Sequence, residues 1–137
     1  MLFRSVEISK NNFSSENKRV FELKRLFLES IMSDIADVYV NGSIEICVPN
    51  ILNLRFGGVE GSALIQQLDL CGIACSAGAA CSAGSVKSSH VLSAIGITEE
   101  EAENSVRFSF GRFTTEEEIA YAVAKLKSII SKIRKNQ

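Results

Sequence analysis

The sequence predicts an α/β (α+β) fold in which helices cover a small, mostly antiparallel or mixed sheet. Three observations predict it. The 137 residues fit one domain of ordinary size, and 46% of them are hydrophobic, so the chain can bury a core. Short alternating segments typical of strands lie between segments of helical periodicity. Two capping boxes near the C-terminal end mark helix starts.

Residues 2–35 contain neither Gly nor Pro and are expected to be helical. Their apolar residues recur every three or four positions, at Val20, Leu23, Phe27 and Ile31. The stretch around Asn11-Asn12 has weaker helix formers and favours a break or a poorly ordered turn.

Two strands are expected next. Residues 38–40 form a short strand that the turn signal Asn41-Gly42 ends. In residues 50–56, apolar and polar side chains alternate, which predicts a strand with one covered face made of Leu52, Leu54 and Phe56.

The middle of the chain alternates helices and short extended segments. Residues 61–70 have a helical pattern that Gly72 stops, and 73–75 are a short strand candidate. A short helix is expected around 91–95, ending at Gly96.

Two capping boxes lie in the last third of the chain. Thr98 with Glu101 opens one helix and Thr115 with Glu118 opens another, so the glutamates there serve as caps and not as catalysts. Residues 106–110 alternate as a strand between them. The final helix carries an apolar stripe of Ile119, Val123, Leu126, Ile130 and Ile133.

Charge and composition exclude several classes. A net charge of −1 argues against a nucleic-acid binder, which needs massed Lys and Arg. No apolar run approaches the roughly 18 to 20 residues of a membrane span, and no signal-peptide pattern opens the chain. Four cysteines without a secretion signal indicate free thiols in a reducing compartment, so a cytoplasmic location is expected.

Cys81 is the first candidate for chemistry. It lies in residues 76–85, where only small side chains occur. Such a loop lets another molecule approach the thiol closely, and a reactive thiolate needs that access. On local composition alone, a tight turn that happens to hold a cysteine is the more ordinary interpretation.

Arg107 is the second candidate. If Val106 and Phe108 face the core, Arg107 lies on the opposite face of the strand. A guanidinium fixed there suits a carboxylate, because it can donate two parallel hydrogen bonds. An ordinary surface arginine is the alternative.

The remaining candidates favour structural roles. His90 is the single histidine and has no acidic neighbour, so it is interpreted as a cap or surface residue. Cys47 and Cys75 lie in apolar, strand-like sequence and Cys71 ends a helix. The spacing of Cys71, Cys75 and Cys81 lacks the Cys-x2-Cys pattern of zinc sites, so no metal site is expected.

Taken together, the segments resemble the C-terminal small domain of a cysteine desulfurase, a class V aminotransferase-like enzyme of fold-type I that uses pyridoxal 5′-phosphate (PLP). The resemblance runs from about Val38 to the end. It is carried by Pro49-Asn50-Ile51-Leu52-Asn53, Val59-Glu60-Gly61, Gly72 to Ser85, Ser89-His90-Val91-Leu92, Ala94-Ile95-Gly96 and Val106 to Glu118.

The resemblance implies a role for both candidates. Cys81 matches the nucleophile that takes sulfur from L-cysteine, leaving L-alanine and an enzyme-bound persulfide. Arg107 matches the arginine that pairs with the substrate carboxylate. The persulfide sulfur would pass to an acceptor or scaffold protein, for iron–sulfur cluster assembly or thiolation, and a homodimer or self-association is expected.

The resemblance also implies an incomplete enzyme. Residues 1–35 correspond to a linking helix region and 36–137 to the small domain. The PLP-binding large domain, with its Schiff-base lysine, has no counterpart here. PLP is therefore expected in the complete enzyme and not on this chain alone, which is expected to be inactive by itself. Cys75 departs from the family pattern and is expected to be buried and inert.

Two other functions stay open. The chain could be a non-catalytic sulfur-relay or interaction module that accepts a persulfide on Cys81. It could also be a degenerate aminotransferase-like domain with a structural role, in which case the Cys81 thiol would be no more reactive than that of Cys71.

Overall fold

The structure is a computed structural model that describes residues 2–77 and 89–136, with side chains described from residue 13 onward. Three antiparallel strands form one sheet in the order β1-β2-β3. This confirms the predicted fold class. The elements in chain order are α1 (Leu2–Asp34), β1 (Val38–Val40), β2 (Ile51–Phe56), α2 (Gly61–Asp69), α3 (His90–Ala94), α4 (Glu99–Glu103), β3 (Ser105–Ser109) and α5 (Glu116–Lys135).

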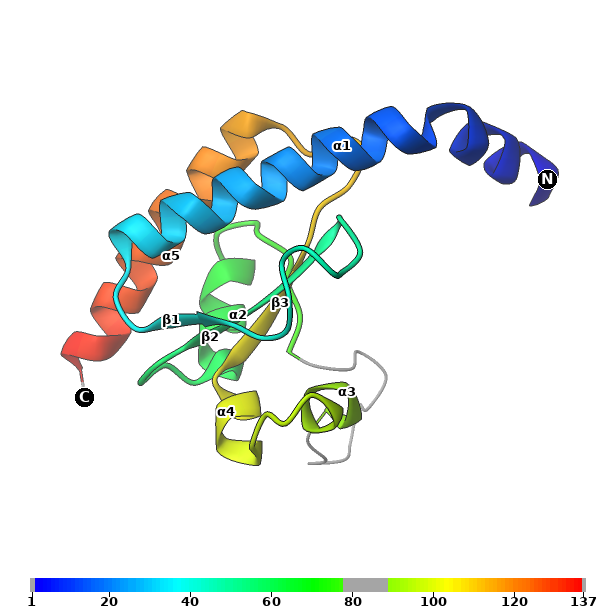
Figure 1. The fold of residues 1–137 in the computed structure, drawn as a ribbon. Helices are drawn as coiled ribbons and strands as arrows, with labels where there is room; N and C mark the ends of the chain where they lie inside the picture. The colour runs from blue at the N-terminus through cyan, green and yellow to red at the C-terminus, as the bar shows by residue number, and fades with distance from the viewer. Residues whose placement is uncertain (1, 78–88, 137) are drawn as a thin grey trace.

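Helices α1 and α5 lie side by side and cover one face of the sheet (Figure 1). The predicted alternation is confirmed, since Leu52, Leu54 and Phe56 of β2 are buried. The Phe27 ring of α1 packs 5.0 Å from the Phe108 ring of β3, centroid to centroid. The second half of α1 from Val20 onward, together with Ile35 just after the helix, therefore shares one core with the sheet and α5.

Helix α1 passes through Asn11 and Asn12 without interruption, so the expected break there is wrong. Asparagine costs a helix only a few tenths of a kcal/mol relative to good helix formers. Once a helix is nucleated, each added residue gains a hydrogen bond. The strongly amphipathic second half supplies that nucleus.

The strand expected over residues 73–75 is also wrong, because these residues have no regular structure and only Ser76 pairs with β3. The amide of Ile73 donates instead to the carbonyl of Leu68, at 2.9 Å, and so closes the end of α2. Gly72 makes this reversal possible with φ +75°. Sequence reasoning identified the helix stop but not how far the capping turn extends.

The remaining helices begin at or within one residue of the predicted positions. Both capping boxes form, at Thr98 with Glu101 and at Thr115 with Glu118. Ser89 caps α3, and Gly96 follows it with φ +84°. Hydrogen bonds of the Glu117 carboxylate with its own backbone and with the side chain of Thr115 hold the pKa of Glu117 below its usual value.

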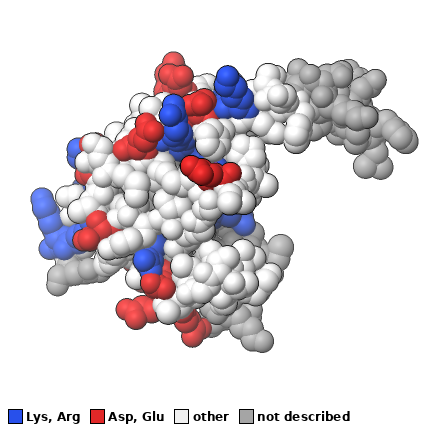
Figure 2. Space-filling view, in the orientation of Figure 1, with Lys and Arg blue, Asp and Glu red and all other residues white. Residues whose placement is uncertain are grey.

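Charged side chains of both signs are interspersed on the face drawn in Figure 2, and neither sign forms a continuous patch there. Of the helices in residues 2–77 and 89–136, none combines the length and apolar character of a bilayer-spanning segment.

Candidate functional site

The face of the sheet opposite α1 and α5 is polar. Because side chains alternate along a strand, Asn53 and Arg55 of β2 and Ser105 and Arg107 of β3 point away from the helical layer. The register pairs Asn53 with Arg107 and Arg55 with Ser105. This face carries the candidate site.

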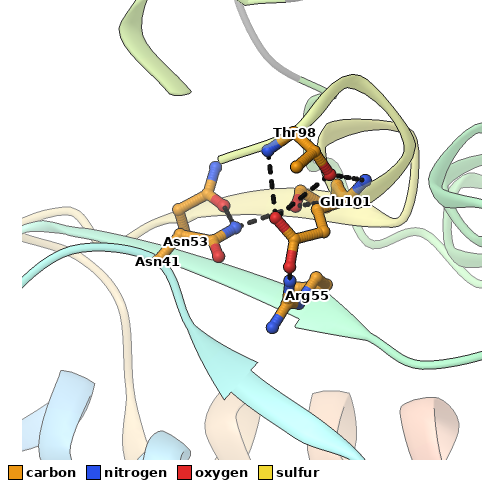
Figure 3. Close-up of polar contacts among 6 residues, drawn as sticks. Asn41, Asn53, Arg55, Thr98 and Glu101 are labelled. Carbon is orange, nitrogen blue, oxygen red and sulfur yellow. Dashed lines mark hydrogen bonds and ion pairs between the residues drawn. The ribbon is translucent and has the colours of Figure 1, made fainter. Parts of the chain in front are cut away.

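An amide and hydroxyl network holds the centre of this face (Figure 3). The Asn41 side-chain amide donates to Asn53 Oδ1 at 2.7 Å and to Ser105 Oγ at 2.8 Å. Ser105 is fully buried, and its hydroxyl donates to the carbonyl of Glu101 at 2.7 Å. The turn after β1, the strands β2 and β3 and the helix α4 are thus fixed together beside Arg107. Sequence reasoning interpreted Asn41 as part of a turn signal and did not assign Asn41 or Asn53 to a site, although Asn53 interrupts the apolar pattern of its strand.

The carboxylate of Glu101 links α4 to the sheet. One oxygen pairs with the guanidinium of Arg55, and the other accepts hydrogen bonds from the Thr98 amide and hydroxyl at 3.0 and 3.1 Å (Figure 3). The Arg55 guanidinium also lies over the Tyr39 ring, 4.5 Å from its centroid. Glu101 is therefore a cap, as predicted, and in addition an ion-pair partner that the sequence did not indicate.

Arg107 is half-buried, and its Nε atom is buried without a hydrogen-bond partner among the described residues. A buried N–H left unpaired costs about 1–3 kcal/mol, so it indicates a partner that completes the site. An anion with two oxygens matches Nε and a terminal nitrogen of the same guanidinium.

A cavity of about 440 Å³ lies against Arg107. Its described lining comes from the ends of β1 and β2, residues 41–48 and α3, and includes Asn53 and Ser89. No Asp or Glu is among the described lining residues, so Arg107 supplies the only formal charge there. The cavity therefore favours a small anionic ligand.

The chain on both sides of residues 78–88 is fixed at this cavity. Ser76 pairs with Arg107, whose amide donates to the Ser76 carbonyl at 2.7 Å while the Ser76 amide donates back at 3.2 Å. Ser89 lines the cavity. Cys81 itself lies outside the described residues.

The described cysteines differ from one another. Cys47 is exposed in the segment that joins β1 and β2, so its expected strand-like, structural setting is wrong. Cys71 and Cys75 are half-buried. Burial, together with the charge of Asp69, raises the pKa of Cys75 to about 11, so its thiolate is scarce at neutral pH. His90 is exposed at the first position of α3, as predicted for a surface residue.

The described residues do not form a PLP site. The cavity lining contains no lysine for a Schiff base and no carboxylate for a pyridine nitrogen. Among residues 2–77 and 89–136, no group of three or more His, Cys, Asp or Glu could hold a metal ion. The chemistry that this part of the chain offers is anion binding by Arg107.

Comparisons with known proteins agree with one another. Residues 6–121 match the family model described as aminotransferase class-V. The chain is 48% identical over 127 residues to cysteine desulfurase IscS of Proteus mirabilis and 44% identical to that of Pseudomonas putida, covering 93% of this chain and 31% of each relative. A NifS-like protein of known structure superimposes with a TM-score of 0.80 at 28% identity, over 94% of this chain and 32% of that one. The chain thus spans about a third of the length of the relatives it matches.

Proposed function

Because the chain belongs to the class-V aminotransferase family, we propose that it forms the C-terminal part of a cysteine desulfurase. The proposed reaction converts L-cysteine to L-alanine and leaves the sulfur atom as a persulfide on the enzyme. Support comes from relatives that carry this name over 93% of the chain and from the chemistry of the cavity beside Arg107.

Arg107 binds the substrate carboxylate in this proposal. The unpaired, buried Nε is the observation that carries it, since a bidentate carboxylate satisfies that atom. The Arg107 backbone is hydrogen-bonded to Ser76 on one side and pairs with Asn53 on the other, so the base of the side chain is held in place. A fixed cation orients a small amino acid with little loss of freedom on binding.

Cys81 accepts the sulfur atom in this proposal. It follows Ser76, the residue that pairs with Arg107, by five positions in the sequence. Five residues span at most about 18 Å, so the length of chain between Ser76 and Cys81 is compatible with the thiol reaching the Arg107 cavity in this proposal. The Cys81 thiolate attacks the substrate sulfur, an S–S bond forms and the C–S bond breaks. The carbon fragment keeps the electron pair of the C–S bond and takes up a proton, which gives alanine.

The rest of the enzyme completes the site. We propose PLP as cofactor of the whole protein, held by residues outside those described, where it would activate the amino acid for C–S cleavage. Residues 1–35 then form a linking helix region and 36–137 the small domain. Four apolar side chains at the cavity rim are exposed, which favours a second protein surface that covers them: Ile46, Val48, Val91 and Ile95. A homodimer and a separate sulfur-acceptor protein are part of the proposal.

A chimera tests this function. The matching C-terminal third of the Proteus mirabilis cysteine desulfurase is replaced by this chain, and sulfide and alanine production from L-cysteine are measured. We expect activity that Cys81→Ser abolishes, and a fall in kcat/KM of roughly a hundredfold in Arg107→Gln, because a buried charge pair is broken. A folded, PLP-loaded chimera that produces no alanine would contradict the proposal.

A sulfur-relay module is the second candidate. It is favoured for the chain alone because the described lining of the cavity contains neither a lysine nor a carboxylate that could hold PLP. Treating the purified 137-residue chain with a low-molecular-weight persulfide distinguishes the sulfur-relay function from the desulfurase function. One added sulfur atom on Cys81, together with an inactive chimera, favours the relay. Sulfide release by the isolated chain with PLP and cysteine would contradict the proposal that it is inactive alone.

A further inference from the structure

Apart from the Arg107 cavity, the structure contains a buried cation. Among the described residues, Lys24 of α1 is the charged side chain with no solvent exposure. Its ammonium nitrogen lies 3.1 Å from Cys47 Sγ and 3.3 Å from the carbonyl oxygen of Val48. The Phe21 ring centroid is 5.0 Å away. No described carboxylate is paired with it.

This arrangement is electrostatically incomplete. A buried ammonium is costly unless it is hydrogen-bonded and paired with an anion. The carbonyl and the ring supply partial negative charge, and a neutral thiol is a weak acceptor. An anionic sulfur at Cys47 would supply the missing charge directly along the existing 3.1 Å contact.

Cys47 is open to small molecules from the opposite side. It is the exposed cysteine among the three that the structure describes, whereas Cys71 and Cys75 are half-buried. It also lines the cavity that Arg107 lines, so a solute small enough to enter the cavity reaches its sulfur. One sulfur atom thus faces a buried ammonium on one side and a solvent-connected cavity on the other.

We propose that Lys24 and Cys47 form a thiol modification site, at which hydroperoxides oxidise Cys47 to a sulfenic acid. The sulfur attacks one oxygen of hydrogen peroxide, an S–O bond forms and the O–O bond breaks. The hydroxide departs on the cavity side, takes up the thiol proton through solvent and leaves as water. Sulfur loses two electrons and the peroxide gains them, so Cys–SH and H2O2 give Cys–SOH and H2O.

Lys24 has two roles in this step. Its ammonium stabilises the negative charge that develops on sulfur, and it remains hydrogen-bonded to the product when that is a sulfenate. The site is separate from the proposed desulfurase function, because it needs neither Cys81 nor a bound amino acid. An oxidised Cys47 would place a negative charge on the wall of the Arg107 cavity.

The test uses the full 137-residue chain, limiting hydrogen peroxide and dimedone, which traps sulfenic acids. Peptide mass spectrometry then gives the labelling rate at each cysteine. We expect Cys47 to be labelled at least about fivefold faster than Cys71 and Cys75, the size that one ion-pair interaction at a partly exposed site provides. Equal rates at Cys47 and Cys71 would overturn the proposal.

Two lysine variants isolate the ammonium. Lys24→Met keeps the length of the side chain and should lower Cys47 labelling about fivefold, with Cys71 labelling unchanged, while Lys24→Arg keeps most of the rate. An unchanged Cys47 rate in a folded Lys24→Met chain would refute the role of Lys24. If that variant does not fold, the wild-type chain is alkylated with anionic iodoacetate and with neutral iodoacetamide. The rate with iodoacetate divided by the rate with iodoacetamide should be higher at Cys47 than at Cys71, and equal ratios would overturn the proposal.

Discussion

Replacing Gly61 with alanine should destabilise the protein through one well-defined contact. Gly61 is the buried first residue of α2, where the helix meets the start of β3. A Cβ atom built there would lie 2.8 Å from the carbonyl oxygen of Glu103 and 2.9 Å from that of Ser105. Both oxygens belong to the backbone, so relief requires the helix and the strand to move apart and not a side chain to rotate.

The size of the effect follows from two opposing contributions. Overpacking against a fixed backbone costs about 1–3 kcal/mol, and alanine at an ordinary helix position gains at most about 1 kcal/mol over glycine. That gain is smaller at the first helical residue, so we expect a net loss of about 2 kcal/mol in the free energy of unfolding. For a 137-residue chain, with an unfolding entropy of about 2.1 cal/mol/K per residue, this lowers Tm by about 7 °C.

Thermal unfolding followed by circular dichroism measures the effect, and Gly111→Ala is the matched control. A Cβ at Gly111 meets only Thr114 Oγ1, at 3.9 Å, which is ordinary contact. We expect the control to melt within a degree or two of the wild type. A Gly61→Ala chain that melts at the wild-type temperature would refute the packing argument. Because Ser105 begins the strand that carries Arg107, the same substitution should also weaken substrate binding in the chimera.

Three further results are expected. Glu101→Ala should lower the free energy of unfolding by about 1–2 kcal/mol in urea titrations, because it removes a cap and the ion-pair partner of Arg55. Arg55→Ala should lower the free energy of unfolding by less in the Glu101→Ala background than in the wild type. The pKa of Cys75 is raised from 9.0 to about 11 in the folded chain, so the unfolded chain loses the thiol proton at a lower pH than the folded chain does. The stability that Cys75 contributes is therefore fully present below pH 9.0 and is lost as the pH rises toward 11. A Cys75→Ala chain should lack this part of the alkaline decline, and rapid alkylation of native Cys75 at about pH 8 would contradict the shifted pKa. Arg134 donates three hydrogen bonds to the carbonyls of Ala36 and Gly57, which follow α1 and β2, so Arg134→Ala should cost about 1–2 kcal/mol, whereas exposed Lys135→Ala in the same helical turn should change stability by less than about 0.5 kcal/mol.

The fold was largely predictable from local patterns. Alternation located β2 and β3, and the Thr-x-x-Glu pattern located the starts of α4 and α5, because both depend on residues close in sequence. The prediction failed at residues 73–75, since their apolar composition fits a strand and a capping turn equally well. Only the hydrogen bond from Ile73 to Leu68 distinguishes the two.

The site was predictable in part. Strand alternation predicted that Arg107 would leave the core, and the structure agrees. The contacts of Asn41 with Ser105 and of Lys24 with Cys47 join residues 64 and 23 positions apart, and no local pattern encodes them. One signal for Lys24 was present, because it lies four residues after Val20 and three before Phe27 on the apolar face of its helix. The roles of Cys81 and Arg107 in catalysis stay predictions.

Because the sheet is pleated, successive residues of a strand face opposite sides of the sheet. Along β2, Leu52 and Leu54 serve the packing beneath α1 and α5, while Asn53 between them serves the opposite side. Neighbouring residues of one strand therefore meet different physical requirements. A substitution at an outward position is therefore expected to alter the polar face without disturbing the hydrophobic layer, and its cost in stability comes from the polar contacts it removes.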